Sequence, residues 1–238
     1  MGSSIIELIG EQQNQYLLTG AITRDAEAGL ADNNVIKNPE EAICTCDVVI
    51  DFSVVENITN TLSIAVKYKK PIVIGITGLQ KEHKTEIENA AKQIPIVYSE
   101  NMAISVNLML DFIKNTSRKV KNIQNVIITE KHREDKKDSI SGTALKIKEQ
   151  IEEEIDQQKV KTKSIRKGNI SGEHEITFES ENEIITISHK ANSRKTYAEG
   201  SLIAAKWIKT KKTGLYGMRE ALDAHQNRNI QQEGLQKK

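Results

Sequence analysis

The chain has 238 residues, 28% of them charged, and its 34 basic and 33 acidic side chains leave a formal net charge of +1. A charge this balanced provides no overall field that would draw the protein to nucleic acid or to a membrane surface. The sequence holds no apolar run near the roughly 18 residues of a membrane span, and its N-terminal segment lacks the basic start and apolar core of a signal peptide, so we expect a soluble cytoplasmic protein.

The first part of the chain alternates between strand-like and helix-like segments. Apolar runs rich in branched residues predict strands at Tyr16–Ile22, Asp47–Asp51, Pro71–Ile76 and Ile94–Tyr98. Helices are expected at Ser3–Gly10, Val54–Tyr68 and Lys81–Gln93. Alternation of this kind indicates βαβ units and a parallel sheet, in which ligands bind beyond the carboxyl ends of the strands.

The pattern changes after Asn101. Helices are expected at Ile104–Lys119, Thr143–Ile155 and Arg194–Lys209, and strands at Ile123–Thr129, Thr162–Arg166, Glu175–Ser180 and Glu183–His189. The last two strands read as an antiparallel hairpin. We therefore predict an α/β protein with a Rossmann-like, doubly wound parallel sheet in residues 1–103, joined by residues 214–238. A second, α+β domain is expected in residues 104–213.

The segment Glu130–Ala144 gathers reactive side chains between an expected strand and an expected helix. His132, Arg133 and Lys136 place two cations and a titratable imidazole there, and Ser141-Gly142-Thr143 leaves backbone N–H groups at a helix N-terminus, which favours an anion. The arrangement suits a small substrate that carries carboxylates and receives a proton from His or Lys. A solvated charged loop with an ordinary serine cap is the alternative that composition allows.

The same segment resembles the signature E-x-H-H-x-x-K-x-D-x-P-S-G-T-A of the 4-hydroxy-tetrahydrodipicolinate reductase (dihydrodipicolinate reductase) family. The matching positions are Glu130, His132, Lys136, Asp138 and Ser141–Ala144. Further blocks are similar to that family's blocks and follow its order: DVVIDFS at 47–53, IVIGITG at 72–78, ENMAISVNLML at 100–110, then 166–168 with 172–174, 189–191 with 193–194, and 214–216. The resemblance covers nearly the whole chain.

The resemblance implies roles position by position. His132 and Lys136 match the catalytic histidine and lysine, and the sequence leaves open which of them gives the proton. Substrate carboxylates would contact Arg133, Ser141, Gly142 and Thr143. Cofactor contacts would come from Met1, Thr23, Arg24, Gly75, Ile76, Thr77, Ser99, Glu100, Asn101 and Met102. Arg24 matches a basic residue that meets an adenosine 2′-phosphate, so NADPH is expected, with NADH as the alternative.

Several positions depart from the family pattern. Arg133 replaces the second histidine of the signature but keeps donors and positive charge. Ile140 replaces a proline, Ile76 replaces a threonine in a cofactor turn, and Thr23 stands where many members carry a carboxylate. Met1-Gly2 matches only the end of the family's Gly-rich phosphate turn, so the first strand of the sheet is missing from this sequence. We expect a native start upstream of Met1.

The implied reaction is the reduction of 4-hydroxy-tetrahydrodipicolinate to tetrahydrodipicolinate, on the diaminopimelate route to lysine. The implied partners are a cyclic dicarboxylate substrate and further copies of the chain in a homotetramer, with no nucleic acid and no membrane. No metal site is expected, because Cys44 and Cys46 alone cannot complete a tetrahedral set. A non-catalytic remnant that keeps a dicarboxylate-binding or oligomer-forming domain is the first alternative, and another oxidoreductase on this architecture is the second.

Overall fold

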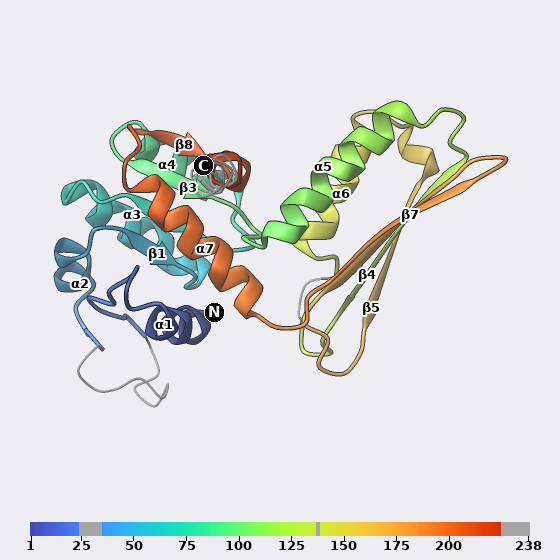
Figure 1. Ribbon diagram of the computed structural model, residues 1–238. Coiled ribbons are helices and arrows are strands. Elements are labelled where there is room, and N and C mark those ends of the chain that lie inside the picture. The colour runs from blue at the N-terminus through green and yellow to red at the C-terminus, as the bar shows by residue number, and fades with distance from the viewer. Residues whose placement is uncertain (24–34, 137–138, 225–238) are drawn as a thin grey trace, which may run out of the picture. The chain divides into compact units, whose positions relative to one another are not determined.

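The structure is a computed structural model that describes residues 1–23, 35–136 and 139–224 (Figure 1). The chain divides into two compact units, one formed by Met1–Met102 together with the chain from Tyr197 onward, the other by Ala103–Thr196. The chain returns to the first unit at Tyr197, earlier than the expected residue 214. The reason is that Ala198 and Leu202 of helix α7 (Lys195–Ile208) are buried in one apolar cluster with Ile5 and Leu8 of the first unit.

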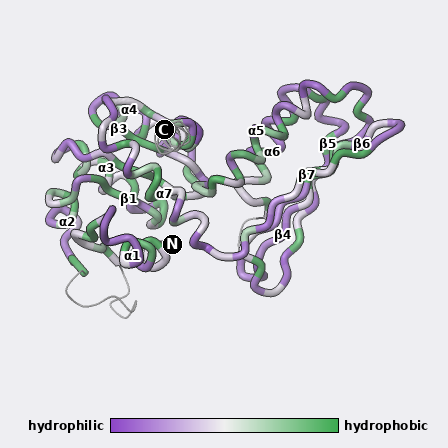
Figure 2. The backbone as a smooth tube through the Cα atoms, viewed as in Figure 1, coloured by the Kyte–Doolittle hydropathy of each residue, from purple (hydrophilic) through white to green (hydrophobic). Residues whose placement is uncertain are grey.

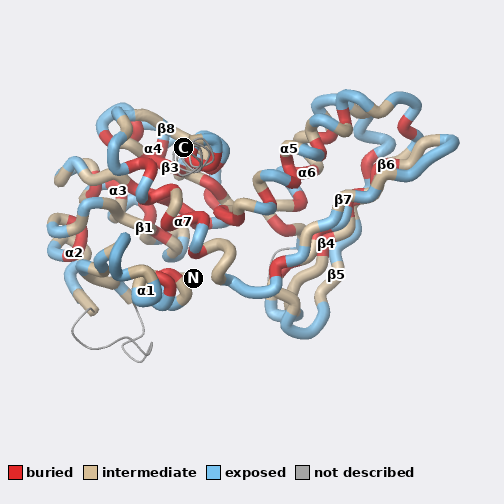
Figure 3. The backbone as a smooth tube through the Cα atoms, viewed as in Figure 1, coloured by how far each residue is buried: buried red, intermediate tan, exposed pale blue. Residues whose placement is uncertain are grey.

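The first unit is built on a parallel sheet of four short strands. They are β1 (Val49–Asp51), β2 (Ile72–Ile74), β3 (Pro95–Tyr98) and β8 (Gly214–Tyr216), in the order β1-β2-β3-β8. All three residues of β2 are buried, as expected for a central strand that is covered on both faces. Figure 3 shows buried residues on these strands and on the helices beside them.

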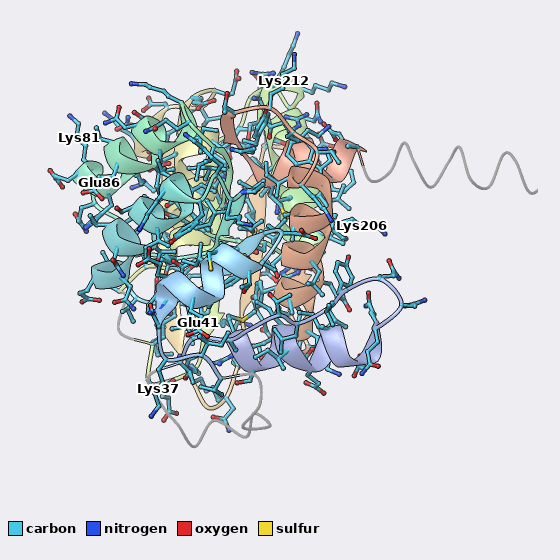
Figure 4. All side chains as sticks on the ribbon, turned by 90° about the vertical axis from the view of Figure 1, so that its left-hand side faces the viewer. Lys37, Glu41, Lys81, Glu86, Lys206 and Lys212 are labelled. Atoms are coloured by element: carbon cyan, nitrogen blue, oxygen red, sulfur yellow. The ribbon has the colours of Figure 1, made fainter. Side chains whose placement is uncertain are left out.

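Helices cover this sheet. α1 (Gly2–Glu11) belongs to the cluster with α7, whereas α3 (Ile58–Lys67) and α4 (Lys81–Ala91) bury apolar residues against β2 and β3. The outer side of α4 is charged, and Lys81 and Glu86 point outward in Figure 4. A short 3₁₀ turn, η2 (Val55–Asn57), precedes α3. The predicted parallel α/β arrangement of this unit is confirmed.

Helix α2 (Pro39–Thr45) was not expected. Asn38 caps it, since its Oδ1 accepts a hydrogen bond of 2.9 Å from Glu40 N, and Pro39 occupies the first helical turn together with two acidic residues. These are the standard start signals of a helix, so the sequence contained the information.

The strand expected at Tyr16–Ile22 is wrong for this structure. Within the described residues, this stretch forms a single parallel bridge, between Ala21 and Val35. A strand is stabilised by a neighbouring ladder, and apolar β-type residues alone do not supply one. The cofactor residue Arg24, expected just after this stretch, lies outside the described residues.

The second unit is a mixed sheet covered by two helices. Its elements are α5 (Ile104–Lys119), β4 (Asn125–His132), α6 (Gly142–Glu152), the 3₁₀ turn η3 (Gln157–Lys159), β5 (Val160–Arg166), β6 (Glu173–Glu179) and β7 (Ile184–Lys190). The strand order is β5-β4-β6-β7, and β4 pairs parallel with β5 and antiparallel with β6. The expected hairpin is confirmed, because β6 and β7 pair antiparallel.

Strand β4 carries the residues that matter for the site. Its buried residues alternate, at Val126, Ile128 and Glu130, so its inner face is apolar at first and polar toward the end. Hydrophobic and hydrophilic stretches alternate along this sheet in Figure 2. The expected loop start at Glu130 is therefore wrong: Glu130 and His132 belong to the strand, because β5 and β6 continue to pair with it. None of the helices in the described parts of the chain is long and apolar enough to cross a membrane.

Candidate active site

A row of polar side chains crosses the inner face of the second sheet. Glu130 on β4 pairs in register with His174 on β6, which pairs with His189 on β7. Residues in register on neighbouring strands point to the same face. His132 lies two residues beyond Glu130 and thus on the same face, in register with Arg166 of β5. One ionised carboxylate, one guanidinium and three imidazoles are therefore collected on one surface.

Glu130 has no exposed surface, and each of its carboxylate oxygens lies against a basic side chain. Oε1 lies 2.7 Å from Arg166 Nη2, and Oε2 is hydrogen-bonded to His132 Nδ1. Burial opposes ionisation of this carboxyl, but hydrogen bonds from Arg166 and Ser164 and the neighbouring His132 hold its pKa below the ordinary value. Glu130 is thus a buried, ionised carboxylate whose charge is balanced by the guanidinium of Arg166.

His132 is mostly buried, with 12% of its side chain exposed. Burial lowers its pKa, Glu130 opposes that effect, and Lys136 and Arg166 add to it. The result is an imidazole that is mostly neutral at pH 7 and still reaches the surface of the unit. A group of this kind can exchange protons with a bound molecule.

His174 on β6 lies beside Glu130 of β4 and contacts Ser141 at the start of α6. It is 2% exposed, its Nε2 is 3.3 Å from Ser141 Oγ, and its ring meets that of His132 edge-on at 5.4 Å between centroids. Burial, with the nearby His132 next in weight, lowers the pKa of His174 to about 3, so this ring is neutral at physiological pH. His189 continues the row, with its Nε2 2.8 Å from Ser105 Oγ of α5.

The N-terminus of α6 is formed as expected. Ser141 is the cap, since its Oγ accepts a hydrogen bond of 3.2 Å from Ala144 N. Gly142 and Thr143 then begin the helix, where backbone N–H groups have no acceptor within the helix. Because Ser141 also contacts His174, the helix N-terminus is fixed to the polar row of the sheet.

The loop between β4 and α6 carries the other expected substrate residues. Arg133 follows the strand directly and pairs with Asp135 at 2.5 Å, and the Lys136 N–H donates to the Arg133 carbonyl at 3.3 Å. The loop is fastened to β5, because Arg166 Nη2 donates to Ser139 O at 3.2 Å. The structure thus brings His132, Arg133 and Lys136 onto one short segment.

The expected cofactor residues of the first unit lie at the carboxyl edge of its sheet. Gly75, Ile76 and Thr77 follow β2, and Ser99, Glu100, Asn101 and Met102 follow β3. Neighbouring strand ends are joined there, since Ser99 N donates to Ile74 O at 3.1 Å and Gly75 N donates to Asp51 O at 2.9 Å.

This edge offers an acceptor to a ligand that carries hydroxyl or amide donors, as a nicotinamide cofactor does. Asp51 is 6% exposed, and its Oδ2 accepts no hydrogen bond from the described residues, so it is free to accept one from a ligand. Thr23 is at the margin of the described region, and Met1 is the cap of α1. The two units each carry part of the expected set of site residues.

The family signature implies no role for His174 and His189, which the structure places in the polar row. Their alternation with Ile176 and Ile187 on β6 and β7 was a usable signal, because it puts each histidine on the apolar face of its strand. The distances among Glu130, His132 and His174 also suit a metal ion, with ligand atoms within 4.8 Å of one another. However, Glu130 already contacts Arg166, whose charge opposes a dication, so we interpret the group as a carboxylate–imidazole pair against which the His174 ring packs.

Comparisons with known proteins agree with this geometry. Residues 1–102 match the family described as "Dihydrodipicolinate reductase, N-terminus", and residues 105–222 match "Dihydrodipicolinate reductase, C-terminus". The 4-hydroxy-tetrahydrodipicolinate reductase of Pseudoalteromonas atlantica is 34% identical over an alignment of 252 positions, which covers 93% of this chain and 94% of the relative. That of Caldanaerobacter subterraneus subsp. tengcongensis is 35% identical over 237 residues, covering 92% and 93%.

Solved structures have the same fold. A dipicolinate-bound dihydrodipicolinate reductase from Paenisporosarcina sp. TG-14 matches with a TM-score of 0.75 at 20% identity and covers 92% of this chain and 94% of its own. An amine dehydrogenase from Mycobacterium smegmatis matches with a TM-score of 0.63 at 10% identity, covering 90% and 91%. With both halves of the chain matched by the family and full-length relatives above 30% identity, the chain belongs to the dihydrodipicolinate reductase family.

Proposed function

We propose that this protein reduces 4-hydroxy-tetrahydrodipicolinate to tetrahydrodipicolinate with a nicotinamide cofactor, on the diaminopimelate route to lysine. The observation that carries the proposal is the imidazole of His132, oriented by Glu130 and followed by Arg133, Lys136 and the N-terminus of α6. Cations and helical N–H groups bind carboxylates, and an imidazole beside them can move a proton. The relatives with this activity span nearly the whole chain.

We assign substrate binding to the second unit. Arg133 and the N–H groups of Gly142 and Thr143 would bind its two carboxylates, and Ser141 would hold the helix end in place. His132 or Lys136 supplies the proton that accompanies the hydride, which the reduced nicotinamide provides when bound. The first unit is assigned the cofactor, along the turns after β2 and β3.

Lys136→Ala tests the role of the loop. We expect turnover to fall about a hundredfold or more, because a catalytic or carboxylate-binding cation is lost, while NADPH affinity changes little, because the cofactor turns belong to the other unit. Steady-state kinetics and calorimetry measure the two quantities. Lys131→Ala, on the opposite face of β4, is the matched control and should leave both unchanged. Lost NADPH affinity with normal turnover in Lys136→Ala would refute the assignment.

We further propose that NADPH is preferred over NADH. Arg24 can make a charge-assisted contact to a 2′-phosphate, and Thr23 carries no charge that would repel it. A contact of about 1.5–3 kcal/mol corresponds to a preference of about ten- to a hundredfold. Values of kcat/KM for both cofactors, before and after Arg24→Ala, test this. Equal use of the two cofactors by the parent protein contradicts it, and failure to bind either one would favour the non-catalytic alternative.

A homotetramer in the cytoplasm is proposed as the working state. β7 is an edge strand whose Ile184 is 66% exposed, which leaves backbone and apolar surface available to another copy. Sedimentation analysis of the purified protein measures the state directly, and a monomer at micromolar concentration would contradict the proposal.

A further inference from the structure

We infer that Glu130, anchored by Arg166, is a positioning residue that fixes the tautomer of His132, so that Nε2 is the nitrogen that exchanges a proton with the substrate. The inference deepens the proposed function and rests on it.

The first support is the rigidity of the pair. Glu130 and His132 lie two residues apart on β4, so both side chains leave the same face of a strand that is paired on both sides. Arg166 lies opposite His132 in register and contacts the Glu130 carboxylate at 2.7 Å. The guanidinium is itself held, since its Nη1 donates to Ile165 O at 3.0 Å and its Nη2 to Ser139 O at 3.2 Å. The carboxylate therefore has one fixed orientation.

The second support is hydrogen-bond chemistry. An ionised carboxylate only accepts hydrogen bonds, so the His132 nitrogen that contacts it must carry hydrogen. That nitrogen is Nδ1. In the neutral ring Nε2 is then a lone-pair acceptor, and in the cation Nε2–H is the proton that can leave while Nδ1–H stays with Glu130. The ring gains and loses its mobile proton at one atom only.

The third support is the charge around the ring. Burial disfavours the cation of His132 most, Glu130 favours it, and Lys136 from the loop and Arg166 from β5 disfavour it. The His174 ring from β6 also meets His132 but is neutral, so it adds no charge. Removing the carboxylate charge thus leaves His132 among basic groups. A Gln at position 130 can also present its amide NH₂ to Nδ1, which selects the opposite tautomer.

The experiment is Glu130→Gln, read by nitrogen NMR of the isotope-labelled histidine rings and by the pH dependence of kcat. In the parent we expect His132 to carry hydrogen on Nδ1. In the variant we expect part or all of that hydrogen to move to Nε2, kcat to fall about tenfold to a hundredfold, and the pH midpoint assigned to His132 to move downward. NADPH affinity should stay within about twofold, which corresponds to roughly 0.4 kcal/mol, because the cofactor turns belong to the other unit.

The matched control is Glu173→Gln. Glu173 lies on the opposite face of the same sheet, where it pairs with Lys131 at 3.5 Å and with Lys190 at 3.1 Å. The same loss of a paired carboxylate there should leave the tautomer and the pH profile of kcat as they are in the parent.

Two outcomes overturn the inference: an unchanged His132 tautomer together with an unchanged pH profile in Glu130→Gln, or the same changes in Glu173→Gln. Should Glu130→Gln fail to fold, Glu130→Asp keeps the charge but is one methylene too short to reach both partners. It should therefore also lose the Nδ1 preference, and an unchanged tautomer overturns the inference. The NMR reading needs no substrate, so a parent protein inactive on 4-hydroxy-tetrahydrodipicolinate refutes the proposed function separately.

Discussion

Acidification from pH 7.5 to pH 5 should remove about 2 kcal/mol of the free energy of unfolding through His174 alone. Burial lowers the pKa of this histidine from 6.5 to about 3 in the folded protein. The unfolded chain therefore binds a proton between these values and the folded protein does not. The stability that His174 contributes is complete above pH 6.5 and is lost as the pH falls toward 3.

The magnitude follows from the two pKa values. Each pH unit below 6.5 costs about 1.4 kcal/mol until the folded ring itself takes up a proton. A typical domain is stable by only about 5–15 kcal/mol, so a loss of 2 kcal/mol is easily measured. His132 and His189 also have a pKa lowered by burial and steepen the same dependence in the parent protein.

Urea denaturation of the parent and of His174→Gln, at a series of pH values from 7.5 to 5, tests the reasoning. The variant starts from a lower stability, because Gln fills the site less well, but its curve should be flatter by about 1.4 kcal/mol per pH unit. NMR titration of the parent should show no protonation of the His174 ring above about pH 4. Parallel curves, or a ring that titrates near pH 6.5, would refute the argument.

Two further perturbations are specific to single contacts. Gly200→Ala should destabilise the first unit by about 2–4 kcal/mol in urea denaturation, because a Cβ there would lie 1.7 Å from the backbone oxygen of Met102. Gly10→Ala, with open space around the new methyl group, is its control and should not destabilise α1. Ser141→Ala should cost about 1 kcal/mol as a lost N-cap and should also raise KM for the substrate, measured by kinetics. An unchanged KM would show that Ser141 caps α6 without contributing to the binding of the substrate carboxylates.

Local patterns predicted much of the fold. The helix at Ile104–Lys119 is confirmed with the same bounds, because its apolar spacing and its ends are local features. The parallel sheet and the hairpin are confirmed as well, because strands that alternate with helices, or that follow one another across a short turn, have few ways to pair. The Tyr16–Ile22 strand failed because pairing is not local. α2 shows the opposite case, since the Asn38 cap and Pro39 are local signals that suffice to predict its start.

The site was predicted in part. The residues of the loop follow from the family signature, and the cap at Ser141 follows from local chemistry. What could not be predicted is that Glu130 joins His174 and His189 in one row, because this depends on the register of β4 against β6, which lies much later in the chain. His132 was placed in a loop, although the ladder with β5 extends strand β4 through it.

The alternation of inward and outward side chains along β4 also limits where residues can be inserted or deleted in this chain. One inserted residue before Glu130 would exchange the two faces of the strand end, burying Lys131 beside Arg166 and turning the carboxylate outward. Such an insertion would disrupt both the packing of the strand and the catalytic site, so a change of one residue in the length of β4 should not be tolerated. The turn around Ser180 and Glu183, closed by one hydrogen bond between their backbones, has no such double constraint. Length differences among relatives should therefore collect in that turn and be rare within β4.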